Sequence, residues 1–317
     1  MQCPSTIPLL APYPIGGYQF FREWFAEAWK NSGGTIKEDL PLPWKLKLVL
    51  GKIGCVRSLP GSRGNKPKLL VLCGGRPEYF SWPWCYQYEV VPVMWDCWPK
   101  YWSYLPKFLE KNNVRLIFCT SSQTAEYVNE TVRDCRAVWL PEGIKASLYP
   151  MGSRLVDRPV DVLELGRQMR PVHNGLLRLQ EETGIKHLYQ KDKGLLFADF
   201  DALTQGLRDA KITISYPRCD THPEMAGNIE TMTQRFWECM LSGTLVAGRA
   251  PKELVDFCGY NPVIELGDQP LNKIRAVLKS IDSYQSLADK NRQFAENHAD
   301  WSFRMPIIHN SIKGLVY

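Results

Sequence analysis

The stretch ETMTQRFWE, residues 230–238, is followed directly by CMLSGTLVAG, residues 239–248. Its two glutamates, Glu230 and Glu238, lie eight positions apart, and Glu238 falls in an amphipathic pattern that predicts a helix. In a continuous helix their carboxylates would be about 12 Å apart along the axis and about 80° apart around it. At that distance they cannot share a proton, but they can hold two ends of one extended polar ligand. The alternative is a solvated helix face with two unrelated acids.

The sequence around these glutamates resembles the carboxyl-terminal domain of GT-B glycosyltransferases. The resemblance is to retaining enzymes in particular, of the group 1, family 4-like type, that use nucleotide-sugar donors. Those enzymes carry a glutamate, seven residues and a second glutamate, followed by a helix end of small residues and a strand, as WECMLSGTLVAG does here. Three further segments resemble the same family in the same order: VWLPEGIKASLYP (138–150), DVLELGRQMRPVHNGLLRL (161–179) and AKITISYPRC (210–219).

The resemblance implies an α/β protein of the GT-B class, with two Rossmann-like parallel-sheet domains facing a central cleft. Residues 1–150 would form an acceptor-side domain, residues 151–295 a nucleotide-sugar-binding domain, and residues 296–317 a helix that returns to the first domain. The 317 residues suffice for two domains of about 150 residues each. Proline, glycine, serine and charged residues at 150–158 mark the expected boundary.

The composition argues against a membrane-spanning protein and against a secreted one. No apolar run is long enough for a membrane-spanning helix, and the first residues lack the features of a secretory signal. The 10 cysteines are scattered, and Cys73 and Cys119 fall in apolar runs, which suits buried reduced thiols and a cytoplasmic protein. The net charge of +6 fits an anionic donor or peripheral contact with an anionic membrane, but it is too small to indicate nucleic-acid binding by itself.

Short apolar runs alternate with helical patterns, which is typical of a parallel α/β fold. The predicted strands are 69–73, 90–95, 114–119, 137–140, 160–165, 194–197, 211–216, 244–247 and 262–266. The predicted helices are 17–29, 101–111, 123–130, 174–183, 201–209, 233–242, 251–257 and 270–280. Lysine and leucine alternate at 45–48, so segment 41–66 is predicted to hold an exposed strand or hairpin arm.

The glutamate pair has separate expected roles. By the resemblance, Glu238 accepts hydrogen bonds from the donor ribose, and a carboxylate can accept from two adjacent hydroxyls. Glu230 would contact the transferred sugar. Here the family's glycine-rich approach is replaced by GNIETMT (227–233), so we expect Asn228 or Gly227 to share that contact. Thr231 and Thr233 are candidate caps of the following helix, whose free N–H groups would face the donor phosphates.

The cations of the donor site come from two segments. Arg167 follows a strand and a glycine, as the family's diphosphate-binding arginine does, and guanidinium groups bind phosphate oxygens with two parallel hydrogen bonds. The family's lysine is missing; His173, with Arg170 nearby, would either donate to a phosphate or cap the following helix. Arg235 is a second phosphate candidate, unless it forms a surface ion pair. Because no Asp-x-Asp motif is present, we expect these cations to replace a divalent metal, and we expect no cofactor.

In the first domain, Gly16 and Gly17 precede an apolar helical pattern, where GT-B enzymes place a glycine pair beside the donor phosphate and the acceptor. Asp96 follows a strand within a cluster of five tryptophans, residues 82–102. Aromatic walls beside a carboxylate commonly hold sugar rings, although tryptophans are also large core residues. We expect Asp96 to be an acceptor-side or catalytic carboxylate, with Glu230 and Arg167 as the other catalytic candidates.

The sequence thus predicts a cytoplasmic, metal-independent transferase that moves a sugar from a UDP-type or GDP-type donor to a hydroxyl acceptor such as a saccharide. Two alternatives remain open at this point. One is a transferase that modifies a nucleic-acid base, and the other is a degenerate GT-B protein that binds nucleotide or sugar without turnover.

Overall fold

The structure, a computed structural model, describes residues 7–11, 20–54, 66–191 and 194–315. Within this part the chain forms two compact units. The first combines residues from 1–143, 224–229 and 301–317, and the second comprises residues from 144–223 and 230–300. No helix among the described residues is both long and apolar enough to cross a bilayer.

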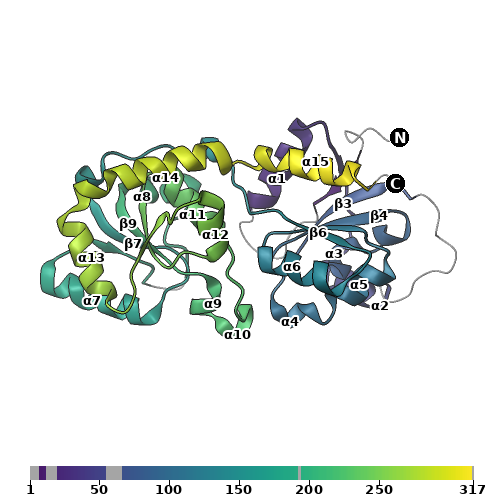
Figure 1. The fold of residues 1–317 in the computed structure, drawn as a ribbon, viewed down its shortest axis with the longest axis horizontal. Helices are drawn as coiled ribbons and strands as arrows, with labels where there is room; N and C mark the ends of the chain where they lie inside the picture. The colour runs from purple at the N-terminus through teal and green to yellow at the C-terminus, as the bar shows by residue number, and fades with distance from the viewer. Residues whose placement is uncertain (1–6, 12–19, 55–65, 192–193, 316–317) are drawn as a thin grey trace. The chain divides into compact units, whose positions relative to one another are not determined.

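The first unit is built on a six-stranded parallel sheet in the order β2-β1-β3-β4-β5-β6. The strands are β1 (Pro8–Leu10), β2 (Thr35–Lys37), β3 (Lys68–Cys73), β4 (Glu89–Met94), β5 (Leu116–Cys119) and β6 (Arg136–Trp139). Its helices are α1 (Phe20–Asn31), α2 (Trp44–Gly54), α3 (Glu78–Ser81), α4 (Pro99–Trp102), α5 (Leu105–Lys111), α6 (Ser122–Thr131) and α15 (Met305–Lys313). α15 lies beside α1, where His309 stacks on Trp29 with ring centroids 4.7 Å apart (Figure 1).

The second unit is built on a five-stranded parallel sheet in the order β11-β10-β9-β7-β8. The strands are β7 (Val160–Glu164), β8 (His187–Leu188), β9 (Ala210–Ser215), β10 (Leu245–Gly248) and β11 (Val263–Glu265). Its helices are α7 (Arg170–Thr183), α8 (Phe200–Asp209), α9 (Arg218–Thr221), α11 (Gln234–Leu241), α12 (Lys252–Cys258), α13 (Pro270–Lys279) and α14 (Gln285–His298). The short α10 (Pro223–Ala226) precedes α11 in the chain, and all of it except Pro223 is grouped with the first unit. α7 and α13 lie on one side of the sheet and α8, α11 and α14 on the other (Figure 1).

Both sheets are parallel and buried between helices, which confirms the predicted α/β class. Most predicted elements are present within one to four residues at each end. The described cysteines form no disulfide, and Cys73 and Cys119 are buried free thiols, as expected. Burial raises the pKa of the Cys135 thiol to about 12, so this sulfur stays protonated at neutral pH.

Two predicted strands were wrong. The segment 41–66 contains helix α2 in place of an exposed strand or hairpin arm. Lys47 and Gly51, one helical turn apart, are buried: Lys47 pairs with Asp39, and a side chain at Gly51 would meet the Glu78 carbonyl at 3.0 Å. This helical spacing outweighs the alternation of lysine and leucine. Residues 194–197 form bends in place of a strand, since Leu195 is 68% exposed.

The predicted helix 101–111 is divided into α4 and α5, because Pro106 stands in the first turn of α5 and favours a helix start there. The short strand β8 was missed, since two residues leave no periodic pattern. Apart from β8 and the segment 194–197, the strands of the second unit are the predicted ones. All five strands run the same way, so the residues that follow β7, β9 and β10 meet at one edge of the sheet.

Buried hydrogen bonds join the end of α11 to this sheet. Arg158 is buried and donates to the carbonyls of Ser153, Ala210 and Ser242 and to the Thr244 hydroxyl, at 2.9–3.1 Å. Burial lowers the pKa of Arg158 to about 10, so the guanidinium still carries its charge at neutral pH. Gly243 turns the chain from α11 into β10 with a φ of +66°, in the left-handed region that favours glycine.

A substitution at Gly248, at the end of β10, can measure how much stability depends on the close approach of β10 to β9. Its φ is +148°, and an added Cβ would lie 1.9 Å from the Ser215 carbonyl oxygen. We expect Gly248→Ala to lower the free energy of unfolding by about 3 kcal/mol or more, because both backbone and packing oppose it. Gly259→Ala is the matched control: φ is +71° with nothing within 4 Å, so a loss of about 1–2 kcal/mol is expected. Urea unfolding of both variants measures the difference, and equal losses would contradict the close approach.

Candidate functional site

Glu238 is a buried carboxylate in the middle of α11. It is 7% exposed, its Oε1 accepts a hydrogen bond of 3.0 Å from the Tyr149 hydroxyl, and its Oε2 pairs with Arg235 one turn earlier. Burial and the Glu238 charge raise the pKa of Tyr149 well above its usual value, so this hydroxyl remains a donor. A carboxylate offers about four acceptor positions. The two contacts leave room for further donors, such as adjacent hydroxyls of a ligand.

Arg235 therefore lies in an ion pair with Glu238, with its side chain 25% exposed. The pair follows the i, i+3 spacing of neighbouring side chains on a helix. The prediction had set a phosphate contact against an ion pair for this residue. The ion pair is present, and a phosphate contact for the remaining guanidinium N–H groups stays a prediction.

Glu230 belongs to a second charged group, at the ends of β9 and β10. Its Oε1 pairs with Arg249, and its Oε2 accepts a hydrogen bond of 2.9 Å from the Lys252 backbone N–H at the start of α12. Arg249 also forms two hydrogen bonds with Asp220, of 2.5 and 2.8 Å. The hydrogen bond to Asp220 raises the pKa of Arg249, and Glu230 adds to this effect. Glu230 thus has a structural role in joining α12 to β10.

A third group lies at the end of β7. The side chain of Glu164 is buried, and its Oε2 contacts His173 Nδ1 at 2.5 Å and His187 Nε2 at 2.9 Å. His173 is in the first turn of α7 and His187 begins β8. Glutamate with two histidines is also a set of metal ligands. A metal ion with bonds of about 2.0–2.2 Å in tetrahedral geometry would hold the ligand atoms about 3.3 Å apart. The shorter separations to a single oxygen instead match protons between the groups.

The other predicted donor residues lie around the same edge or nearby in sequence. Arg167 is exposed and follows Gly166, whose φ of +86° turns the chain out of β7. Thr233 is the N-cap residue of α11, but its side chain makes no capping hydrogen bond. Thr231 is buried, and its hydroxyl has no hydrogen-bond partner among the described residues. Thr233 therefore occupies the N-cap position, one of the two that were predicted, but neither threonine caps α11 through its side chain.

Asn228 lies in the segment that is grouped with the first unit, where its carbonyl accepts a hydrogen bond of 3.3 Å from Gln123. Asp96 follows β4 in the same unit, exposed and with a φ of +50°, a conformation that is uncommon outside glycine. Trp95 and Trp98 beside it are buried. The aromatic cluster therefore supplies core residues there, while the Asp96 side chain faces solvent. Gly16 and Gly17 lie outside the described residues.

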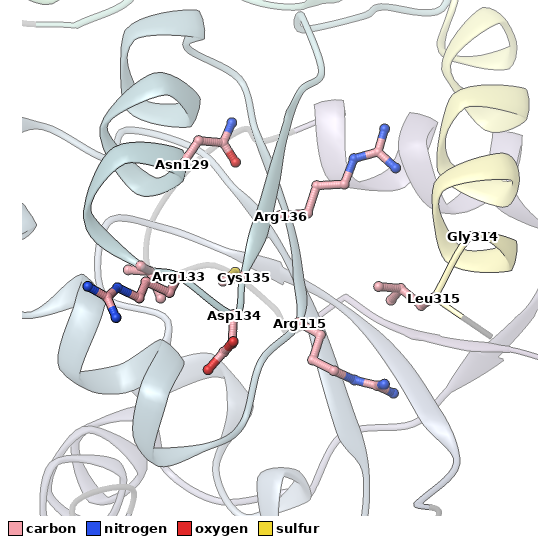
Figure 2. Close-up of a pocket in the computed structure, with 9 residues that line it drawn as sticks. Arg115, Asn129, Arg133, Asp134, Cys135, Arg136, Gly314 and Leu315 are labelled. Carbon is pink, nitrogen blue, oxygen red and sulfur yellow. The ribbon is translucent and has the colours of Figure 1, made fainter. Parts of the chain in front are cut away.

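A hollow of about 480 Å³ lies in the first unit, and Figure 2 shows residues that line it. Arg115, Arg133 and Arg136 line it, with Asp134 and the end of α15, and Arg115 binds Glu89 through two hydrogen bonds of 3.0 Å. The hollow lies where β5 and β6 begin, whereas ligands of parallel sheets bind where strands end. It is therefore separate from the candidate residues.

Sequence reasoning missed five residues of these groups: Tyr149, Glu164, His187, Asp220 and Arg249. Three had a local signal that was available. Tyr149 stands in the segment that closes the first domain by resemblance, Glu164 lies in the predicted strand 160–165 two residues before Gly166, and Arg249 follows the strand after Glu238. His187 had none, because its partner Glu164 is 23 residues away in sequence.

Solved structures with a similar fold identify the fold class of this chain. No protein-family model matches the sequence, and no curated protein matches it. Among solved structures, sucrose-phosphate synthase from Thermosynechococcus elongatus is similar over 98% of this chain and 99% of its own, with a TM-score of 0.64 and 14% identity. The chain has the GT-B fold. HepE from Anabaena in complex with UDP and glucose matches over 98% and 100% of the two chains, with a TM-score of 0.60 and 10% identity. A glycosyltransferase from Rickettsia africae matches over 98% and 99%, with a TM-score of 0.56 and 12% identity.

The contacts of Glu230 in the GT-B chain predict a measurable structural effect. Glu230→Ala removes one of the two acidic partners of Arg249 and the acceptor of the Lys252 N–H. We expect the free energy of unfolding to fall by about 1–2 kcal/mol, the range of a helix-end contact with a charged hydrogen bond. Glu181→Ala, at an exposed position of α7, is the control and should change stability by less than about 0.5 kcal/mol. Equal stability of both variants in urea unfolding would show that the Glu230 contacts contribute nothing.

Proposed function

We propose that this chain is a glycosyltransferase that moves a sugar, a hexose in the simplest case, from a nucleotide diphosphate donor to a hydroxyl acceptor such as a saccharide. The observation that carries the proposal is Glu238: a buried carboxylate, half satisfied by Tyr149 and Arg235, inside the helix that leads into β10 of a parallel sheet. Similar structures support the choice of ligand. HepE structures hold UDP-glucose, UDP, or UDP and glucose.

In this proposal Glu238 accepts the two ribose hydroxyls of the donor. Arg167 and the amino-terminal ends of α7 and α11 face the diphosphate, with the outer N–H groups of Arg235. The departing nucleotide gains negative charge as the glycosidic bond breaks, and guanidinium groups and helix ends stabilise it without a metal ion or cofactor. His173 contacts the diphosphate in place of the family's lysine.

The transfer proceeds with retention of configuration. The glycosidic bond loosens to an oxocarbenium-like state, and the leaving phosphate oxygen takes the acceptor proton, so no enzyme nucleophile is required. Glu230 contacts the sugar through the part of its carboxylate that Arg249 and Lys252 leave accessible, with Asn228 beside it. Asp96, Gly16 and Gly17 act on the acceptor side. The proposed location is the cytoplasm, with peripheral contact to an anionic membrane through the basic excess of the chain.

The proposed role of Glu238 predicts a loss of donor affinity. Glu238→Ala should weaken binding of UDP or GDP by about 1.5–3 kcal/mol, the range of charge-assisted hydrogen bonds. Calorimetric titration of the wild type and the variant measures the change. Glu181→Ala serves as the matched acidic control, and a thermal melt of each variant verifies folding. Equal affinities in folded proteins would rule out the assignment of Glu238.

The absence of a metal from the transfer predicts resistance to chelation. Turnover of UDP-glucose or GDP-glucose, followed by release of the free nucleotide, should persist in EDTA, because cationic side chains carry the leaving group. Loss of turnover that magnesium or manganese restores would contradict this mechanism. Nucleotide binding without any sugar release, with or without acceptors, would instead identify a binding protein.

A further inference from the structure

Helix α2 of the first unit presents apolar side chains to solvent. Leu46, Val49 and Ile53 are 43%, 55% and 58% exposed. Their spacing of three and four residues places them within about 60° of one another around the helix, so they form one continuous stripe along it. The apolar stripe of a surface helix normally faces the core of a globular protein. A stripe that faces solvent instead indicates an interaction surface.

The opposite side of α2 is held by the rest of the unit. The Lys47 side chain is 7% exposed and pairs with Asp39. One turn later, a Cβ added at Gly51 would lie 3.0 Å from the Glu78 carbonyl oxygen and 3.2 Å from the Tyr79 Cα. These two buried positions of α2 lie about 150° around the helix from the middle of the apolar stripe. A rotation of α2 that buried the stripe would break the buried ion pair, so the stripe is fixed facing outward.

The charges of α2 and of its unit are basic. The sequence of α2 contains three lysines and no acidic residue. Lys45, next to the stripe, is exposed and forms no ion pair with any residue that the structure describes. The segments of the first unit hold 19 lysines and arginines against 13 aspartates and glutamates, whereas those of the second unit hold 20 of each kind. The whole net charge of +6 therefore belongs to the first unit.

An anionic lipid bilayer matches both properties of this surface. A helix that lies in the plane of a bilayer buries its apolar face at the boundary of the acyl chains and keeps its lysines at the level of the headgroups. Anionic lipids attract lysines and arginines close to the bilayer surface. A bilayer also accepts a single straight stripe of side chains, whereas a protein partner would need a groove of matching shape with acidic residues around it.

We propose that α2 docks this protein on anionic membranes, with Leu46, Val49 and Ile53 inserted among the lipids and Lys45 at the level of the lipid phosphates. The proposed peripheral contact then acquires a defined element and an apolar component, which the basic excess of the chain alone does not supply. The docking surface belongs to the first unit and does not depend on sugar transfer. A protein that binds no nucleotide sugar would still bind the membrane through α2.

The test is co-sedimentation of the 317-residue chain with two kinds of vesicle, phosphatidylcholine alone and phosphatidylcholine mixed with phosphatidylglycerol. The wild type should bind the mixed vesicles, and Lys45→Gln should weaken that binding about fivefold, because one cation near the surface is lost. Replacement of Leu46, Val49 and Ile53 together by glutamine, a good helix former, should weaken it by about tenfold or more. Val49→Gln alone should weaken it about threefold, which keeps the test available if the triple variant does not fold.

A matched control lies on the second unit. Val156 and Leu195 are apolar residues there that are 48% and 68% exposed. The double variant Val156→Gln, Leu195→Gln should bind the mixed vesicles as the wild type does, because these residues lie outside α2. A thermal melt of each variant verifies folding, and titration with UDP checks that the proposed donor site is unchanged.

Three results would overturn the proposal. Equal binding of the wild type to both kinds of vesicle, or to neither, would contradict docking on anionic lipid. Equal binding of the wild type and a folded glutamine variant would show that the stripe does not insert. A wild type that sediments as a dimer and a triple variant that sediments as a monomer would show that a second copy of the chain covers the stripe. Vesicle binding without any UDP binding would instead contradict the proposed function and leave the docking surface in place.

Discussion

The burial of the Glu238 charge is the constraint on which the second unit depends. A carboxylate that leaves water needs hydrogen-bond donors, and removal of its partners would cost several kcal/mol. Tyr149 and Arg235 supply two donors, one from the segment before β7 and one from the same helix. Tyr149 in turn packs its ring against Phe200 of α8, with centroids 5.5 Å apart. The charge is therefore held by three separate parts of the unit, and its orientation is fixed before any ligand binds.

The parallel order of the strands brings other charged groups to the same edge of the sheet as Glu238. The strands β7, β9 and β10 end at one edge, so Glu164, the Asp220–Arg249–Glu230 group and the start of α11 all follow strand ends there. Each group has its acids already paired with bases or histidines. Preorganised charges of this kind stabilise a developing charge without rearrangement during the reaction. A ligand at this edge meets N–H groups of arginine and helix ends, with acceptors held behind them.

The sequence predicted the frame of this site better than its contacts. Glu238 was placed correctly on a helix before a strand, because amphipathic spacing and the Ser242-Gly243 end are local signals. The contacts of Glu230 with Arg249 and of Glu238 with Tyr149 were not predicted, because these residues become neighbours only through the order of the strands. The pair of Arg235 with Glu238 is local, and an ion pair was one of the two interpretations of Arg235. Lys47 shows the same limit: its alternation with leucine suggests a strand, yet a buried pair with Asp39 and the close packing at Gly51 favour a helix. Pairings over 23 residues, such as Glu164 with His187, leave no periodic trace.

The most direct test of the account is a crystal structure of the protein with UDP bound. The account predicts that both ribose hydroxyls donate to Glu238 beside the Tyr149 and Arg235 contacts, with the diphosphate at the amino-terminal ends of α7 and α11 and within reach of Arg167 and His173. A nucleotide bound elsewhere, or a Glu238 carboxylate that contacts only Tyr149 and Arg235 in the complex, would contradict it.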